Sequence, residues 1–332
     1  MCPTRSGHLK RGEAPSVSRL GMIKRHTSND HRKTQSTSWI PRYILRNPDH
    51  RYRRGRVRSR ILRSPLAPAV LLPARIADVA HYTAGQVAIA FRWLLTSREH
   101  TNFTYEMDQQ SRAYLPHYLA AILGTDSISV EKYLAELECD SDFASTVASC
   151  VASSSYRFTS DREIRIGRRL GWYAIVRLAQ PSLIVETGTD KGLGAAVIGR
   201  ALERNIDEGH FGRLLTIDVN ADSGHLIPAS SEGWVTRLHG VSIEVIENIA
   251  DAVDVFIHDS DHRYDYEMSE YLAVAQKLSP RAVILSDNAQ LSTALHDFAH
   301  QSGRRFLYFG ERAADHWIQG CGIGAAFSST AS

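Results

Sequence analysis

The sequence predicts an α/β fold with a mostly parallel seven-stranded sheet, helices on both faces, and a helical accessory region before it. Three observations lead to this prediction. From Pro181 onward, short apolar runs alternate with helical stretches, which is typical of a parallel sheet. Several of these runs end in a carboxylate, and the first is followed by a turn that contains two glycines. Residues 75–150 instead carry apolar residues at three-to-four spacing, which predicts helices.

The charge distribution separates a leader, residues 1–64, from the rest of the chain. The leader holds 17 Lys and Arg against three acidic residues, whereas the remaining residues carry a net charge of −11. We expect it to be disordered, because it lacks the apolar residues needed to offset chain entropy. Three interpretations stay open: an arm for nucleic acid or another anionic surface, an organelle-targeting leader, or an extension without a role before a later start at Met22. The last is favoured.

Cysteine usage and hydropathy favour a protein of the cytoplasm. The four cysteines are scattered, with no C-x-x-C pair and no metal-ligand spacing, as expected in a reducing compartment. The longest apolar candidate, Leu66–Leu95, is interrupted by prolines and charged residues, so we expect no membrane span.

The elements after the leader follow in order. Residues 65–154 are expected to form the helical accessory or cap region, with one helix ending near Gly124 and another beginning at Ser129. Residues 155–332 are expected to form the α/β domain, opened by a helix near Asp161–Leu178. The expected strands are Leu183–Glu186, Arg213–Asp218, Val235–His239, Val253–Asp259, Ala282–Asp287, Arg305–Phe309 and Gly322–Phe327. Helices are expected at Gly194–Arg204 and Glu267–Leu278, and the last two strands should give the sheet an antiparallel edge.

The turn after the first strand is the clearest binding motif. Glu186 ends the strand, and Gly188 and Gly192 allow close backbone approach at the start of a helix, where N–H groups can hold a small ligand. The dinucleotide pattern G-x-G-x-x-G fits badly, because Asp190 and Leu193 stand where glycines belong.

The spacing acid-x-Gly-x-x-x-Gly resembles the first motif of class I S-adenosylmethionine-dependent methyltransferases, which have a Rossmann-like fold. The resemblance implies S-adenosylmethionine (SAM) as the cofactor. The residues expected to contact it are Glu186, Gly188, Thr189, Gly192, Asp218, Ser242 and Asp259, with Asp218 holding the ribose hydroxyls. The segment that contains Ser242 lacks the acid often found near the adenine in this family.

A second motif surrounds the end of the fourth strand. Asp259 ends this strand, His262 follows on the loop, and Asp287 and Asn288 end the neighbouring strand. Two carboxylates and a carboxamide make an all-oxygen site suited to Mg²⁺. His258 should point away from Asp259, and a structural role is favoured for it.

This second motif resembles O-methyltransferases of the catechol and caffeoyl-coenzyme A type, and more closely a family of small bacterial enzymes with a His-Asp-Ser-Asp-His motif. The resemblance implies that Asp259, Asp287 and Asn288 are metal ligands. His262 falls where the catechol type has a general-base lysine, and a histidine with an ordinary pKa of about 6.5 can accept a proton near neutral pH. The replacement leaves metal dependence open.

We therefore expect a methyltransferase that acts on a hydroxyl of a small molecule or sugar, with His262 as general base and Mg²⁺ assistance left open. Two alternatives remain: a non-catalytic Rossmann-like protein recruited to a polyanion by its basic leader, and a nicotinamide-dependent oxidoreductase. A small-molecule acceptor is the expected partner. Nucleic acid is not expected as a partner, although the basic leader leaves it open. The sequence also leaves open whether the protein forms a homo-oligomer.

Overall fold

A computed structural model describes residues 62–328, so the expectations for the leader up to residue 61 lie outside the described residues. The chain divides into two compact units, residues 1–81 and 82–332. Helix α2, Ala67–Thr96, runs through the boundary and buries none of its residues. Across residues 62–328, no helix is both long and apolar enough to cross a membrane.

Three capped helices follow in the second unit: α3 (Gln109–Leu123), α4 (Ser127–Glu138) and α5 (Ser141–Ser153). An aspartate precedes each helix and accepts hydrogen bonds from its first N–H groups, which lack partners inside the helix. Helix α3 ends as expected at Gly124, in the left-handed conformation with φ 64°. The expected start of α4 at Ser129 is wrong, because Asp126 caps this helix and accepts from the Ser129 N–H.

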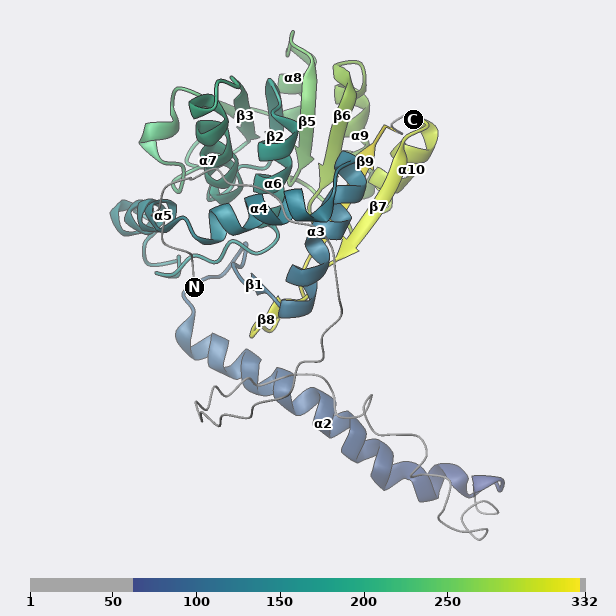
Figure 1. The fold of residues 1–332 in the computed structure, drawn as a ribbon. Coiled ribbons are helices and arrows are strands. Elements are labelled where there is room, and N and C mark those ends of the chain that lie inside the picture. The colour runs from purple at the N-terminus through teal and green to yellow at the C-terminus, as the bar shows by residue number, and fades with distance from the viewer. Residues whose placement is uncertain (1–61, 329–332) are drawn as a thin grey trace, which may run out of the picture. The chain divides into compact units, whose positions relative to one another are not determined.

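The seven expected strands form one sheet in the order β4-β3-β2-β5-β6-β9-β7 (Figure 1). Their bounds are β2 Leu183–Thr187, β3 Arg213–Asp218, β4 Val235–His239, β5 Val253–His258, β6 Leu278–Ser286, β7 Arg305–Gly310 and β9 Gly322–Phe327. Only β9 runs antiparallel to its neighbours, and it lies one place in from the edge, between β6 and β7. A separate pair, β1 (Glu106–Met107) with β8 (Ala313–Ala314), was not anticipated.

Helices cover both faces of the sheet because successive strand residues point to opposite sides (Figure 1). Ile184 and Ile257 belong to one apolar cluster, whereas their neighbours Val185 and Phe256 belong to the other. The helices of the first face are α6 (Arg169–Ala179) and α7 (Leu193–Asp207). Those of the second are α8 (Ser242–Glu247), α9 (Tyr264–Ala275) and α10 (Ala294–Gln301), and a short 3-10 helix, η2 (Ala229–Ser231), precedes β4.

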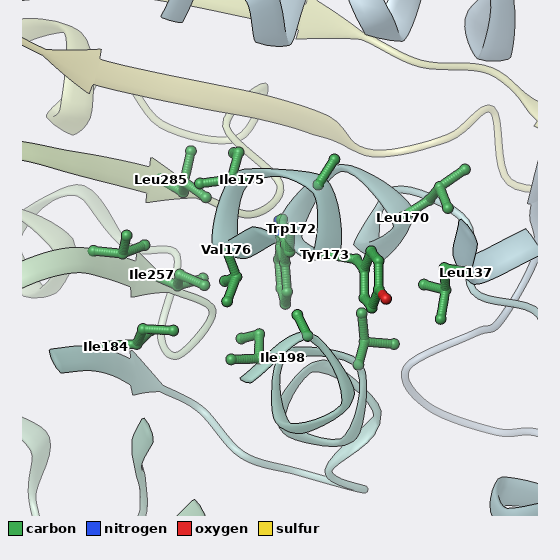
Figure 2. Close-up of a cluster of buried hydrophobic side chains, with 14 of the residues drawn as sticks. Leu137, Leu170, Trp172, Tyr173, Ile175, Val176, Ile184, Ile198, Ile257 and Leu285 are labelled. Atoms are coloured by element: carbon green, nitrogen blue, oxygen red, sulfur yellow. The ribbon is translucent and has the colours of Figure 1, made fainter. Parts of the chain in front are cut away.

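Helix α6 joins the sheet to the accessory helices. Figure 2 shows Trp172 and Val176 of α6 beside Ile198 of α7, with Tyr173 on the side of Leu137. Leu119 and Val147, from the accessory helices α3 and α5, belong to the same cluster. This helix begins at Arg169 rather than near Asp161, because Gly167 turns the chain with φ 55° immediately before it. The accessory helices α3–α5 therefore share one core with the sheet.

Candidate functional site

The glycine turn after β2 is held against the loop that follows β5. Gly188 has φ 86°, and a Cβ atom there would lie 2.0 Å from the carbonyl oxygen of Asp259. Gly192 has φ 88° and precedes α7, and a Cβ atom there would lie 2.8 Å from the Cα of Gly224. Only glycine fits either position, because both the backbone conformation and the space exclude a side chain. The turn therefore presents bare backbone at the start of α7.

A pocket lies at this turn, and Glu186 forms part of its wall. Its lining residues are Asn102, Thr104, Arg169, Glu186, Gly188, Thr189, Asp190, Lys191, Gly192, Leu193, Gly194 and Asp259. The Glu186 carboxylate is buried and accepts a 2.6 Å hydrogen bond from the Thr216 hydroxyl, which in turn lies 2.7 Å from the Thr189 hydroxyl. Burial raises the pKa of Glu186 to about 7, although the hydrogen bond and Arg169 oppose the shift. Its charge is therefore sensitive to a cation placed in the pocket.

The segment 98–104, which we call the cover segment, closes this pocket. The Glu99 carboxylate is fully buried and accepts hydrogen bonds from Lys191 Nζ at 3.0 Å and from the Thr104 N–H at 2.8 Å. Lys191 also donates to the carbonyl oxygen of Asn102 at 3.2 Å. The space that remains is about 20 Å³, against roughly 300–1,000 Å³ for a typical small-molecule site. A cofactor-sized ligand can enter only if the cover segment moves.

Two of the expected cofactor residues lie outside the lining of this pocket. The carboxylate of Asp218, at the end of β3, accepts hydrogen bonds from the N–H groups of Asp190 and Asn220 at 2.7 and 2.8 Å. Each of its oxygens keeps a second lone pair for a further donor. Ser242 instead donates to the buried Glu270, and its hydroxyl lies 2.9 Å from that of Tyr266.

The second motif does come together at the ends of β5 and β6. His262 Nε2 lies 2.9 Å from Asn288 Nδ2 and 3.9 Å from Asp259 Oδ1. Burial lowers the pKa of His262 below its ordinary value, and the neighbouring His258 lowers it further. The imidazole is therefore neutral at pH 7 and able to accept a proton.

The residues expected to hold magnesium, Asp259, Asp287 and Asn288, lie beside a cation of the chain itself. The Arg168 guanidinium, immediately before α6, donates from Nε and Nη2 to the two carboxylate oxygens of Asp287. Both side chains are buried. Among residues 62–328, no three His, Cys, Asp or Glu side chains are grouped to hold a metal ion. These residues fit Mg²⁺ poorly, because a divalent cation bound to Asp287 would face the positive charge of the Arg168 guanidinium paired with the same carboxylate.

The buried carboxylate of Glu270 binds residues at the start of both the glycine turn after β2 and the loop after β5. Its carboxylate accepts from Thr187 at 2.7 Å, from His258 Nδ1 at 2.6 Å, from Ser260 at 2.8 Å and from Ser242. His258 is fully buried, which agrees with the structural role favoured for it. Thr187 and Ser260 stand on either side of the contact between Gly188 and Asp259, so Glu270 fixes that contact from below.

The sequence pattern did not reveal the role of Arg168 or the pairing of Lys191 with Glu99. Lys191 stands inside the glycine motif, but its partner Glu99 is 92 residues away, so no local spacing reveals the pair. Arg168 did leave a signal, because two adjacent arginines at the start of a helix oppose the positive end of the helix dipole.

Residues 185–289, which contain both motifs, match a family model described as a methyltransferase domain. The match identifies these residues as a methyltransferase domain. The resemblance stated from the glycine motif is thereby confirmed for the domain. The match spans β2 to the loop after β6 and so includes Glu186, Asp259, His262 and Asp287.

Solved structures that resemble the methyltransferase are weak matches. The O-methyltransferase TomG from Streptomyces achromogenes, in complex with SAM, is 19% identical, with a TM-score of 0.43 over 57% of this chain and 90% of its own. An O-methyltransferase from Bacillus cereus, in complex with SAH, is 15% identical, with a TM-score of 0.42 over 60% and 100%. A putative O-methyltransferase from Klebsiella pneumoniae is 16% identical, with a TM-score of 0.42 over 66% and 99%. The chain matches no curated protein.

Proposed function

We propose that this methyltransferase transfers the methyl group of SAM to a hydroxyl of a small molecule or sugar, with His262 as general base. One observation carries the proposal. The glycine turn with Glu186 beneath it is in backbone contact with Asp259, three residues before a neutral, half-buried histidine. A cofactor held at the turn thus has a proton acceptor on the adjoining loop.

The cofactor end of the site suits a cation. SAM carries a sulfonium and an ammonium group, and Glu186 and Asp259 line the pocket with carboxyl groups. The bare N–H groups at the start of α7 suit a carboxylate. Asp218 has free lone pairs for the ribose hydroxyls. The cover segment then closes over the bound cofactor and excludes water.

The acceptor end of the site supplies the base. The acceptor oxygen attacks the methyl carbon, the bond from that carbon to sulfur breaks, and the cofactor leaves as a neutral thioether. The hydroxyl proton passes to His262, which is neutral before the reaction. General-base assistance of this kind contributes about 10²–10⁴-fold to a rate, and holding the oxygen in line with the methyl group supplies the rest.

The remaining organisation follows from this assignment. We assign residues 155–332 to the methyltransferase domain and residues 65–154 to a cap on the acceptor side. The cover segment supports this assignment, because it belongs to the cap by sequence and touches the glycine turn through Glu99.

Calorimetric titration of the full-length protein with SAM, and separately with NAD, tests the cofactor. Saturable heat with SAM alone is expected, whereas saturation by NAD alone would favour the oxidoreductase. Gly188→Ala should weaken SAM binding by at least about 100-fold, because its Cβ atom collides with the Asp259 carbonyl. Gly233→Ala is the control, because no atom lies within 4 Å of a Cβ atom there. Equal SAM affinity in both variants would contradict the placement of the cofactor.

A further inference from the structure

Two guanidinium groups meet three carboxyl groups at the ends of β2, β5 and β6, and two of these carboxyl groups are buried. Arg168 pairs with Asp287 through two N–H groups, and Arg169 Nη2 lies 3.9 Å from Asp259 Oδ2. Glu186 is the third carboxyl group of the cluster. Carboxylates this close repel one another in a buried site, so the positive charge opposite them decides whether they stay ionised.

Arg168 is fixed from more than one side. Its Nη1 donates to the Tyr105 hydroxyl at 3.0 Å, and that hydroxyl also accepts from the Cys321 N–H at 2.9 Å and donates to Glu311 at 2.5 Å. The guanidinium therefore cannot swing away from Asp287 without breaking its hydrogen bond to Tyr105, whose hydroxyl is itself held by Cys321 and Glu311.

The effect of this pair on the acids is direct. Burial alone would raise the pKa of Asp287, but the Arg168 charge and its hydrogen bonds lower it to about 2. Burial and the charge of Asp287 raise the pKa of Asp259 well above its ordinary value. Arg168 therefore favours the ionised form of Asp287, whereas burial and Asp287 favour the neutral form of Asp259.

Stability alone explains this arrangement poorly. Arginine is disfavoured at a helix N-terminus, and a buried ion pair is often no more stable than an apolar replacement. The pair instead sits at the strand ends, where the sequence predicted three oxygen ligands for a divalent cation: Asp259, Asp287 and Asn288. The guanidinium occupies the side of Asp287 that such a cation would need.

We propose that Arg168 supplies the fixed positive charge at this point and that the methyltransferase works without a divalent metal ion. The inference rests on the proposed function for its acceptor site. Arg168 acts through Asp287, so it is a positioning residue rather than a catalytic one. Its pairing with Asp287 holds the ends of β5 and β6, where Asp259 and Asn288 face His262, in one arrangement.

Manganese binding tests the proposal without any acceptor. Mn²⁺ is titrated into the full-length protein and the free ion is followed by electron paramagnetic resonance. The wild type should show no saturable site, whereas Arg168→Ala should bind Mn²⁺ at least about tenfold more tightly than the wild type. Adding Asp287→Asn to Arg168→Ala should remove the new site. Arg168→Lys should stay metal-free, because it restores the charge.

Arg200→Ala is the matched control. Arg200 also grips a buried aspartate with two N–H groups, at 2.8 and 3.0 Å from Asp140, but Arg204 pairs with the same carboxylate. This variant should gain no manganese site, so a gain in both variants would overturn the proposal.

Two further outcomes also decide. A saturable Mn²⁺ site in the wild type that Asp287→Asn abolishes overturns the proposal, as does a folded Arg168→Ala that gains none. If Arg168→Ala does not fold, as judged by circular dichroism, the wild type and Asp287→Asn settle the question alone. SAM titration of the same samples in EDTA tests the proposed function separately from the metal-free proposal. An absence of SAM binding would contradict the proposed function but would leave the manganese result unchanged.

Discussion

Replacing Glu270 with glutamine tests whether this buried carboxylate holds the site together. Four side chains donate to it: Thr187, Ser242, His258 and Ser260. Glutamine keeps the shape and can still satisfy these groups, because hydroxyls rotate and can accept from its amide. What changes is the charge, so each hydrogen bond becomes a neutral one.

The expected cost follows from these four bonds. A hydrogen bond to a charged group contributes about 1.5–3 kcal/mol, against about 0.5–1.5 kcal/mol for a neutral one, so four bonds lose about 4 kcal/mol. Relief from burying a charge offsets part of this loss. We expect Glu270→Gln to lower the free energy of unfolding by about 2–4 kcal/mol in urea denaturation. The exposed Glu247→Gln on α8 should change it by less than about 0.5 kcal/mol.

The pH dependence gives a second measurement on the same pair. Burial raises the pKa of Glu270. The hydrogen bonds and charge of His258 and the hydroxyl donors lower it by more than burial raises it, so the pKa lies below its ordinary value. A depressed pKa in the folded state means that the ionised form stabilises the fold above the unfolded pKa and that this contribution is lost in acid. The difference in free energy of unfolding between the wild type and Glu270→Gln should therefore become smaller as the pH falls below about 4. A gap under about 1 kcal/mol at pH 7, or one that widens in acid, would refute the reasoning.

Three further predictions concern the reaction itself. His262→Ala should reduce turnover, measured as SAH formation with a hydroxyl acceptor, by about 10²–10⁴-fold and leave SAM affinity unchanged. Because the pKa of His262 is lowered, turnover of the wild type should persist below pH 6.5. SAM affinity should rise as the pH increases through about 7, where Glu186 ionises, and calorimetry of Glu186→Gln should show a flat profile. Glu99→Gln should weaken the hold of Lys191 on the cover segment. Because breaking one partner of a buried pair costs about 3–5 kcal/mol, the SAM dissociation rate should rise by about 100-fold or more in stopped-flow measurements. An unchanged rate would mean that this contact does not restrain the cofactor.

The sheet could be predicted because each strand is marked by its own short apolar run in the sequence. Arg213–Asp218 and Val235–His239 are strands with the bounds expected from their apolar runs. The meeting of Asp259 with Asp287 also followed, since parallel neighbours end at one edge of the sheet. Local signals failed where two nearby residues could both cap a helix. Asp126 caps α4, three residues before the expected Ser129.

The partners of the charged residues could not be predicted, because they are set by tertiary packing. Arg168 and Asp287 are 119 residues apart, and no period or spacing connects them. From the strand ends alone, Asp259, Asp287 and Asn288 form a set of oxygen ligands. Two carboxylates and a carboxamide suit a hard cation, so these residues were expected to hold Mg²⁺, although such a cluster can also take its positive charge from a side chain.

That positive charge comes from the accessory side of the chain. Gly167, with φ 55°, turns the backbone so that the next two residues face the strand ends, and a Cβ atom there would lie 2.7 Å from the Tyr105 carbonyl oxygen. Tyr105 in turn contacts Arg168 and follows directly on the cover segment. The cover segment and the guanidinium that pairs with Asp287 are therefore joined through Tyr105.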